Sequence, residues 1–223
     1  MNGCQLALLL LCLSAPVQGM DLTRWQQLFR NPGIEPATLQ ERTFLLVRQA
    51  IPEENHDSSA AQEAVRTARQ DSVSHKDDPV DLVLEATARA VIARNSSNLL
   101  EKIGQAGQAL SLFDKAVLLA QGREEEWFVR LFRASTFVYL PDFFQKKKIA
   151  ETDLAWVAET LGNQESLKSL VPVVMFYQGE FVGRQHRDAE AHRLWNRVLA
   201  DAAAFGLPES IYEVRKARDR LGG

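Results

Sequence analysis

The feature that most constrains this chain is an apolar triplet that recurs at a fixed interval. Each triplet has an alanine, an apolar residue four positions later and another three positions after that: Ala109/Phe113/Ala116, Ala150/Leu154/Val157 and Ala191/Trp195/Val198. Steps of four and three residues place side chains on one face of an α-helix. Successive triplets are 41 residues apart, and intervals of roughly 20–50 residues are typical of stacked helical hairpins. The sequence therefore predicts an all-α array of antiparallel helix hairpins.

Residues that end helices divide the chain around these triplets into helix-length segments. Gly, Pro and Asn residues separate the segments, and no alternating strand pattern of useful length occurs. From residue 106 onwards, helices are expected at 106–120, 124–139, 146–161, 165–183, 187–204 and 208–221.

The first part of the chain is also expected to be helical. We expect a short helix that ends at Asn31, a second from Pro36 to about Ala50, and a third opened by a capping box that begins at Ser59. The Asp77-Asp78-Pro79 sequence predicts the start of a fourth, with acidic residues at the positive end of the helix dipole.

The repeat weakens towards the N-terminus. Moving back one interval from the first triplet reaches Ala68, Ser72 and His75, which match it poorly. We therefore divide the chain into an N-terminal helical capping region at 20–94 and a repeat region at 95–223.

Within the repeat region, one segment resembles a tetratricopeptide repeat. The sequence Gln178-Gly179-Glu180-Phe181-Val182, followed by Ala191 and Trp195, has a small residue and an aromatic in a first helix and Ala-x3-aromatic in a second. The resemblance covers about 90–200 and implies a superhelix of antiparallel hairpins with a concave groove. The interval of 41 residues departs from the usual length of about 34, and the closing Pro is missing after Ala116 and Val198. Another α-helical bundle is the alternative.

Residues 1–19 have the composition of a secretory signal peptide. The apolar run from Leu6 to Leu13 is too short to span a bilayer, and small residues precede a plausible cleavage position after Gly19. An uncleaved anchor and a misassigned start codon are the alternatives. Cleavage would remove both cysteines, Cys4 and Cys12. We expect an exported protein, periplasmic in a Gram-negative bacterium and otherwise secreted, with no integral membrane segment after signal removal.

The composition excludes several other classes of protein. The chain has 223 residues, 46% of them hydrophobic and 25% charged, with a net charge of −3. These values are typical of a soluble globular protein and give no general attraction for nucleic acid.

No motif in the sequence predicts catalysis. His186 and His192 are six residues apart, whereas two zinc ligands on one helix need a spacing of about three or four. The chain lacks a recognisable nucleophile motif and a Gly-rich phosphate loop. We expect no catalytic residues, no metal and no cofactor.

The candidate site residues follow from the resemblance and from one loop. In tetratricopeptide-like arrays the first helix of each hairpin lines the concave groove, which makes six residues candidates for contact with a partner: Arg130, Arg133, Thr136, Tyr177, Gln178 and Glu180. The loop residues Phe143 and Phe144 are a second candidate, because aromatics dominate the energetics of interfaces. Alternatively, one of the two fills the gap between neighbouring hairpins.

The function expected from these features is binding. The first hypothesis is an exported, non-enzymatic scaffold or adaptor that binds a protein or peptide partner in the groove of a helical array. The alternatives are a helical small-ligand binder or an enzyme of unrecognised type, and a structural subunit of an envelope complex.

Overall fold

The computed structural model describes residues 21–31, 33–52 and 54–222. This part of the chain forms ten α-helices and two 3-10 turns and contains no β-strand: α1 (Leu22–Arg30), α2 (Leu39–Ala50), α3 (Ser59–Ser74), α4 (Pro79–Asn95), α5 (Leu99–Ala120), α6 (Glu126–Val138), η1 (Asp142–Phe144), α7 (Lys147–Asn163), η2 (Lys168–Leu170), α8 (Val171–Gly183), α9 (Asp188–Ala204) and α10 (Tyr212–Gly222). The predicted all-α class is confirmed. The predicted signal peptide at 1–19 lies outside the described residues.

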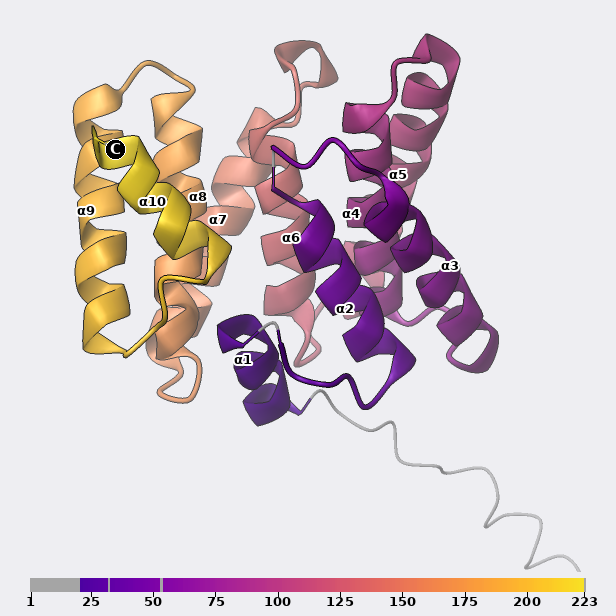
Figure 1. Ribbon diagram of the computed structural model, residues 1–223, viewed down its shortest axis with the longest axis horizontal. Coiled ribbons are helices and arrows are strands. Elements are labelled where there is room, and N and C mark those ends of the chain that lie inside the picture. Colours follow the sequence, from indigo (N-terminus) through magenta and orange to yellow (C-terminus); the bar gives the residue numbers. More distant parts are fainter. Residues whose placement is uncertain (1–20, 32, 53, 223) are drawn as a thin grey trace, which may run out of the picture.

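Helices that are neighbours in sequence pack in pairs. Contacts join α2 to α3, α4 to α5, α6 to α7 and α8 to α9. A second set joins alternate helices, from α2 to α4, α4 to α6, α6 to α8 and α8 to α10. Figure 1 shows these pairs side by side, with α9 and α10 at the end of the molecule farthest from α3 and α5.

The repeated triplets occupy equivalent places in this arrangement. They lie on α5, α7 and α9, and all nine side chains are at most 7% exposed. Each of these helices packs against the helix before it and the helix after it. The prediction that the triplets are buried helix faces is confirmed.

Four predicted helix starts were wrong. The helix expected from Pro36 begins as α2 at Leu39, because the Thr38 side chain accepts from the amide of Glu41 at 3.1 Å. α5 begins at Leu99 rather than 106, because the Asn98 side chain accepts from the amides of Leu100 and Glu101 at 3.0 and 3.3 Å. The expected helix at 165–183 starts as α8 at Val171, after a 3-10 turn, and the one at 208–221 starts as α10 at Tyr212.

The capping signals in the first part of the chain had mixed outcomes. The start at Asp77-Asp78-Pro79 is confirmed, since Asp78 accepts from the amide of Val80 at 2.8 Å and Pro79 opens α4. The capping box at Ser59 was wrong. Ser59 lies inside the first turn of α3, and its amide donates to Asp57 at 2.8 Å.

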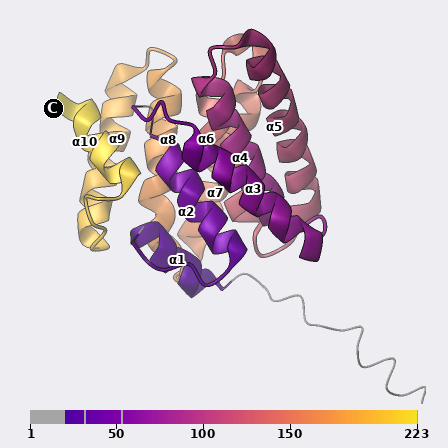
Figure 2. The same cartoon turned by 45° about the vertical axis from the view of Figure 1, so that its right-hand side comes forward.

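The short helix α1 is held by aromatic side chains. Trp25 packs edge-on against Phe44 of α2 at 5.1 Å and against Phe128 of α6 at 4.8 Å between ring centroids. Phe29 packs edge-on against Phe44 at 4.9 Å and lies near Phe132. The helix therefore joins α2 to α6, and Figure 2 shows it across the end of the helices.

No helix in the described part of the chain has both the length and the apolar character needed to cross a bilayer.

Candidate functional site

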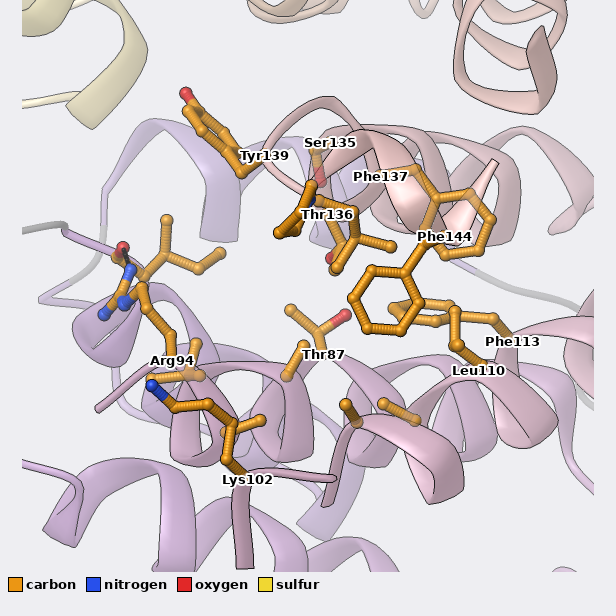
Figure 3. A pocket seen from close by; sticks show the side chains of 18 of the residues that line it. Thr87, Arg94, Lys102, Leu110, Phe113, Ser135, Thr136, Phe137, Tyr139 and Phe144 are labelled. Atoms are coloured by element: carbon orange, nitrogen blue, oxygen red, sulfur yellow. Dashed lines mark hydrogen bonds between the residues drawn. The ribbon is translucent and has the colours of Figure 1, made fainter. Parts of the chain in front are cut away.

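A cavity of about 580 Å³ opens between α4, α5, α6 and η1. Thr87 and Val91 of α4, Leu110 and Phe113 of α5 and Phe137 of α6 form much of its wall. We call this cavity the α4–α6 pocket. Figure 3 shows these helices around it, with Phe113, Phe137 and Phe144 gathered at one end.

The pocket follows from the unequal lengths of two adjacent helices. α5 has 22 residues and α6 has 13, so at 1.5 Å per residue α5 is longer by about 13 Å. Residues 121–125 join the two helices at the end of α5. The first turns of α5 therefore extend beyond the end of α6 and leave an apolar face uncovered.

The uncovered face is an apolar stripe along α5. Its members recur at steps of four and three residues and all line the pocket: Leu99, Ile103, Ala106, Leu110 and Phe113. Leu99 is 68% exposed and Ile103 is 61% exposed, whereas Phe113 is buried. The stripe thus runs from the open mouth of the pocket to its floor.

Two of the hydroxyls that line the pocket already donate hydrogen bonds within the protein. The Thr87 hydroxyl donates to the Val83 carbonyl at 2.8 Å, and the Ser135 hydroxyl donates to the Phe132 carbonyl at 3.0 Å. Both donors are therefore used within their own helices. A polar group placed here would lose water without gaining a donor from these hydroxyls, which favours an apolar occupant.

Two cationic side chains line the end of the pocket opposite Phe113, Phe137 and Phe144, on the side where Tyr139 also lies. Figure 3 shows Arg94 and Lys102 together on the side away from Phe113 and Phe144. Arg94 donates to the carbonyls of Ile51 and Ala50 at 2.8 and 3.2 Å, which ties the chain after α2 to this end of the pocket. Lys102 is exposed and forms no ion pair with another residue that the structure describes.

The loop aromatics Phe143 and Phe144 both line the pocket. Their ring centroids lie 4.4 Å apart, Phe143 is 76% exposed and Phe144 is half-buried. Phe144 faces Phe137 across the aromatic end of the pocket (Figure 3). The pair therefore combines a ring at the wall with a ring in solvent, and use of Phe143 by a partner stays a prediction.

The groove candidates on α6 form ion pairs with α7. Arg133 donates to both carboxylate oxygens of Asp153, at 2.7 and 2.9 Å, and Arg130 donates to Asp153 at 2.8 Å and to Glu126 at 2.7 Å. Asp153 is buried. The contacts with Asp153 join the two helices of one pair. The third candidate on α6, Thr136, lines the pocket.

The candidates on α8 also contact neighbouring helices. Glu180 is buried and accepts from Arg220 of α10 at 2.9 and 3.0 Å. Gln178 donates to the Leu154 carbonyl at 3.4 Å. Tyr177 donates to Glu213 at 2.9 Å and lines the pocket. The structure therefore brings Thr136, Tyr177, Phe143 and Phe144 together at the pocket and places the other candidates between helices.

Sequence reasoning missed the first two turns of α5. Leu99, Lys102 and Ile103 line the pocket, yet the helix was expected to begin at 106. The signal was present, because Asn98 is a strong N-cap and the apolar stripe continues without interruption from Leu99.

A buried carboxylate lies elsewhere on α4. Asp81 is 1% exposed, and Gln40 of α2 donates to it at 3.2 Å. Burial, together with the nearby carboxylates of Asp78 and Asp71, raises the pKa of Asp81 to about 8. In the described part of the chain, no three His, Cys, Asp or Glu side chains are grouped so that they could hold a metal ion.

No protein-family model, curated protein or solved structure matches this chain.

Proposed function

We propose that this chain is an exported, non-enzymatic binding protein that holds a small apolar or amphiphilic ligand in the α4–α6 pocket. The observation that carries the proposal is an apolar cavity of about 580 Å³ whose mouth is lined by exposed Leu99, Ile103 and Phe143. Small-molecule pockets are typically apolar and have volumes of roughly 300–1,000 Å³. The function is retention of a ligand, with no bond made or broken.

We further propose that the scaffold is a tetratricopeptide-like superhelix. Two features support this architecture: paired helices with additional contacts between alternate helices, and buried triplets at an interval of 41 residues. In such a scaffold α4 and α6 are first helices of consecutive hairpins and α5 is a second helix. The pocket then lies where the two hairpins diverge.

The pocket is preferred to the concave groove for a physical reason. Arg130, Arg133 and Glu180 are engaged in ion pairs between helices. A partner that recruited these side chains would have to break those pairs, whereas a ligand in the pocket displaces only solvent.

A second candidate function is that of an adaptor for a protein or peptide partner. Two exposed apolar side chains on elements that line the pocket favour it: Leu100 of α5 is 81% exposed and Phe143 of η1 is 76% exposed. Large apolar side chains gathered on a surface are typical of interaction sites. The contact would then be made by these residues and the pocket mouth.

Binding of an uncharged naphthylamine dye, followed by fluorescence, tests the first function. The wild-type protein should give saturable binding, and Ala106→Trp should abolish it, because the indole fills the pocket from the half-buried Ala106 position. Leu118→Trp is the matched control, since Leu118 lies on the same helix, is exposed and does not line the pocket. Equal binding by a folded Ala106→Trp protein would contradict the proposal.

A photo-reactive residue placed at Phe143 distinguishes the second function. Cross-linking in the native compartment should give a protein adduct if this surface holds a protein partner. The adaptor function predicts that the adduct is lost in Leu100→Glu, which leaves the pocket open. Absence of any protein adduct, together with dye binding, would reject the adaptor and leave the small-ligand function.

A further inference from the structure

We infer that the ligand of the α4–α6 pocket is a single-chain anionic amphiphile, with its aliphatic chain against the aromatic end and its head group beside Lys102. The inference rests on the proposed function and names the class of ligand. The two ends of the pocket differ in chemistry, and each end constrains one part of the ligand.

The aromatic end requires an apolar chain. Phe113 and Phe137 are fully buried, with ring centroids 5.4 Å apart in an edge-to-face arrangement. Leu110 and Phe144 complete this end of the wall (Figure 3). No hydroxyl proton is available from Thr87, which donates to its own helix. Aliphatic CH₂ groups are therefore the chemistry that gains most from entering this end.

The opposite end of the pocket carries the positive charge of Lys102, which has no evident role in stabilising the fold. Lys102 lies in the first turns of α5, where the helix dipole disfavours a cation. Its neighbour Glu101 forms no ion pair with it, and the Glu101 carboxylate instead accepts from the Ser96 hydroxyl at 2.7 Å. Lys102 forms no ion pair among the described residues, although it lines the pocket. An anionic head group is the complement of this placement.

The neighbouring Arg94 fixes the wall against which the head group would lie. Its guanidinium donates to the carbonyls of Ala50, Ile51 and Pro52, at 3.2, 2.8 and 3.3 Å. These bonds hold the end of α2 against α4. The cationic end is therefore a fixed structure, while the long side chain of Lys102 is able to follow the head group.

The two natural sources of such a ligand are a free fatty acid and an anionic lysophospholipid. Both have one aliphatic chain and a negative head, and the cavity of about 580 Å³ suits one chain better than the two chains of a diacyl phospholipid. The shared chemistry is what the pocket recognises, and the experiment separates the sources.

The test is displacement of the naphthylamine dye, below the micelle concentration, by dodecanoate, dodecyltrimethylammonium and dodecanoyl-lysophosphatidylglycerol. We expect both anions to bind more tightly than the cation. Shortening dodecanoate to decanoate should weaken binding about 15-fold, because two CH₂ groups leave the pocket. If dodecanoate alone competes, the ligand is a fatty acid; if the lysolipid competes better, it is a lysophospholipid.

The variant Lys102→Glu tests the head-group position. It should weaken dodecanoate binding by about 5- to 20-fold, the effect of losing one near-surface ion pair and adding one repulsion, and it should tighten binding of the cation. Lys148→Glu is the control, because Lys148 is exposed on α7 and does not line the pocket. Equal effects of the two variants, or equal affinity for the anion and the cation, would overturn the inference. Continued dye binding blocked by Ala106→Trp would then leave the proposed function standing, whereas absence of dye binding would reject both.

Discussion

Arg48 of α2 and Glu213 of α10 form a bidentate, buried ion pair between residues 165 positions apart in the sequence. The second of its two contacts is 2.7 Å long, and Tyr177 of α8 donates to the same carboxylate at 2.9 Å. Burial alone would raise the pKa of Glu213, but the charge of Arg48 and the hydrogen bonds from Arg48 and Tyr177 lower it below its usual value. The pair therefore remains charged and joins the beginning of the helical structure to its end.

Removal of one partner from this pair should be costly. Arg48→Met leaves the Glu213 carboxylate buried with its charge uncompensated, and we expect the free energy of unfolding to fall by about 3–5 kcal/mol in urea denaturation. Arg218→Met is the control, because Arg218 pairs with Glu209 on the surface and both side chains are exposed. A loss for Arg48→Met no larger than that of the control would show that the pair is not a structural link.

A second buried pair gives a prediction that differs from the groove hypothesis. If Arg133 were a groove residue, its reversal to Glu would weaken partner capture without changing stability. In the structure Arg133 lies against the buried carboxylate of Asp153 at 2.7 Å. We therefore expect Arg133→Glu to lower the free energy of unfolding by about 3–5 kcal/mol, measured by urea denaturation.

A second variant, Arg133→Met, separates the repulsion between two carboxylates from the loss of the arginine charge. Arg133→Met removes the charge but keeps much of the apolar stem, and Asp153 stays paired with Arg130 at 2.8 Å, so Arg133→Met should lose less stability than Arg133→Glu, which adds a second carboxylate beside Asp153. A melting temperature unchanged by Arg133→Glu would contradict the structural role.

Asp81 should make stability fall as the pH rises. Its pKa is about 8 in the folded protein against an ordinary value of 3.8, so between these values the folded state holds a proton that the unfolded state releases. The free energy of unfolding then decreases with rising pH by up to about 1.4 kcal/mol per pH unit. The contribution of protonated Asp81 is fully lost above its folded pKa. Unfolding in urea at several pH values from 5 to 8 would measure the slope.

The variant Asp81→Asn isolates this contribution. An amide has no proton to lose, so the variant should flatten the slope and be more stable than the wild type near pH 8. Asp188→Asn is the control, because Asp188 is exposed at the start of α9. Identical slopes for the wild type and Asp81→Asn would assign the pH dependence to other groups.

The all-α class was predictable because the local periodicity of apolar residues indicates helices. The triplets at Ala109, Ala150 and Ala191 mark helix faces by spacing alone, and their burial required no knowledge of the partner helix. The pocket was not predictable in the same way. It depends on how far α5 extends beyond α6, which is a difference between two helix lengths in three dimensions.

The groove candidates illustrate a second limit of the sequence. Arg130 and Arg133 belong to α6, as expected, but a sequence does not reveal that Asp153 of α7 lies opposite both. The same holds for Arg48 and Glu213, whose pairing depends on the path of all the helices between them. Residues that were predicted to contact a partner are therefore engaged in long-range ion pairs that hold helices together.

The helices α8 and α9 approach each other closely where Gly179 lies against Trp195. A Cβ atom added at Gly179 would lie 2.5 Å from Nε1 and 2.7 Å from Cδ1 of Trp195, so Gly179→Ala requires the indole or the helix to move. Such overpacking costs about 1–3 kcal/mol, which outweighs the gain of up to about 1 kcal/mol expected for Ala over Gly within a helix. The control is Gly107→Ala on α5, where a Cβ would have no neighbour within 4 Å, and there the variant should gain about 0.5–1 kcal/mol. Opposite changes in the urea midpoint for the two alanine variants are expected. A gain at both positions would mean that the indole of Trp195 moves at little cost, and that the small residue at 179 is not required for the packing of α8 against α9.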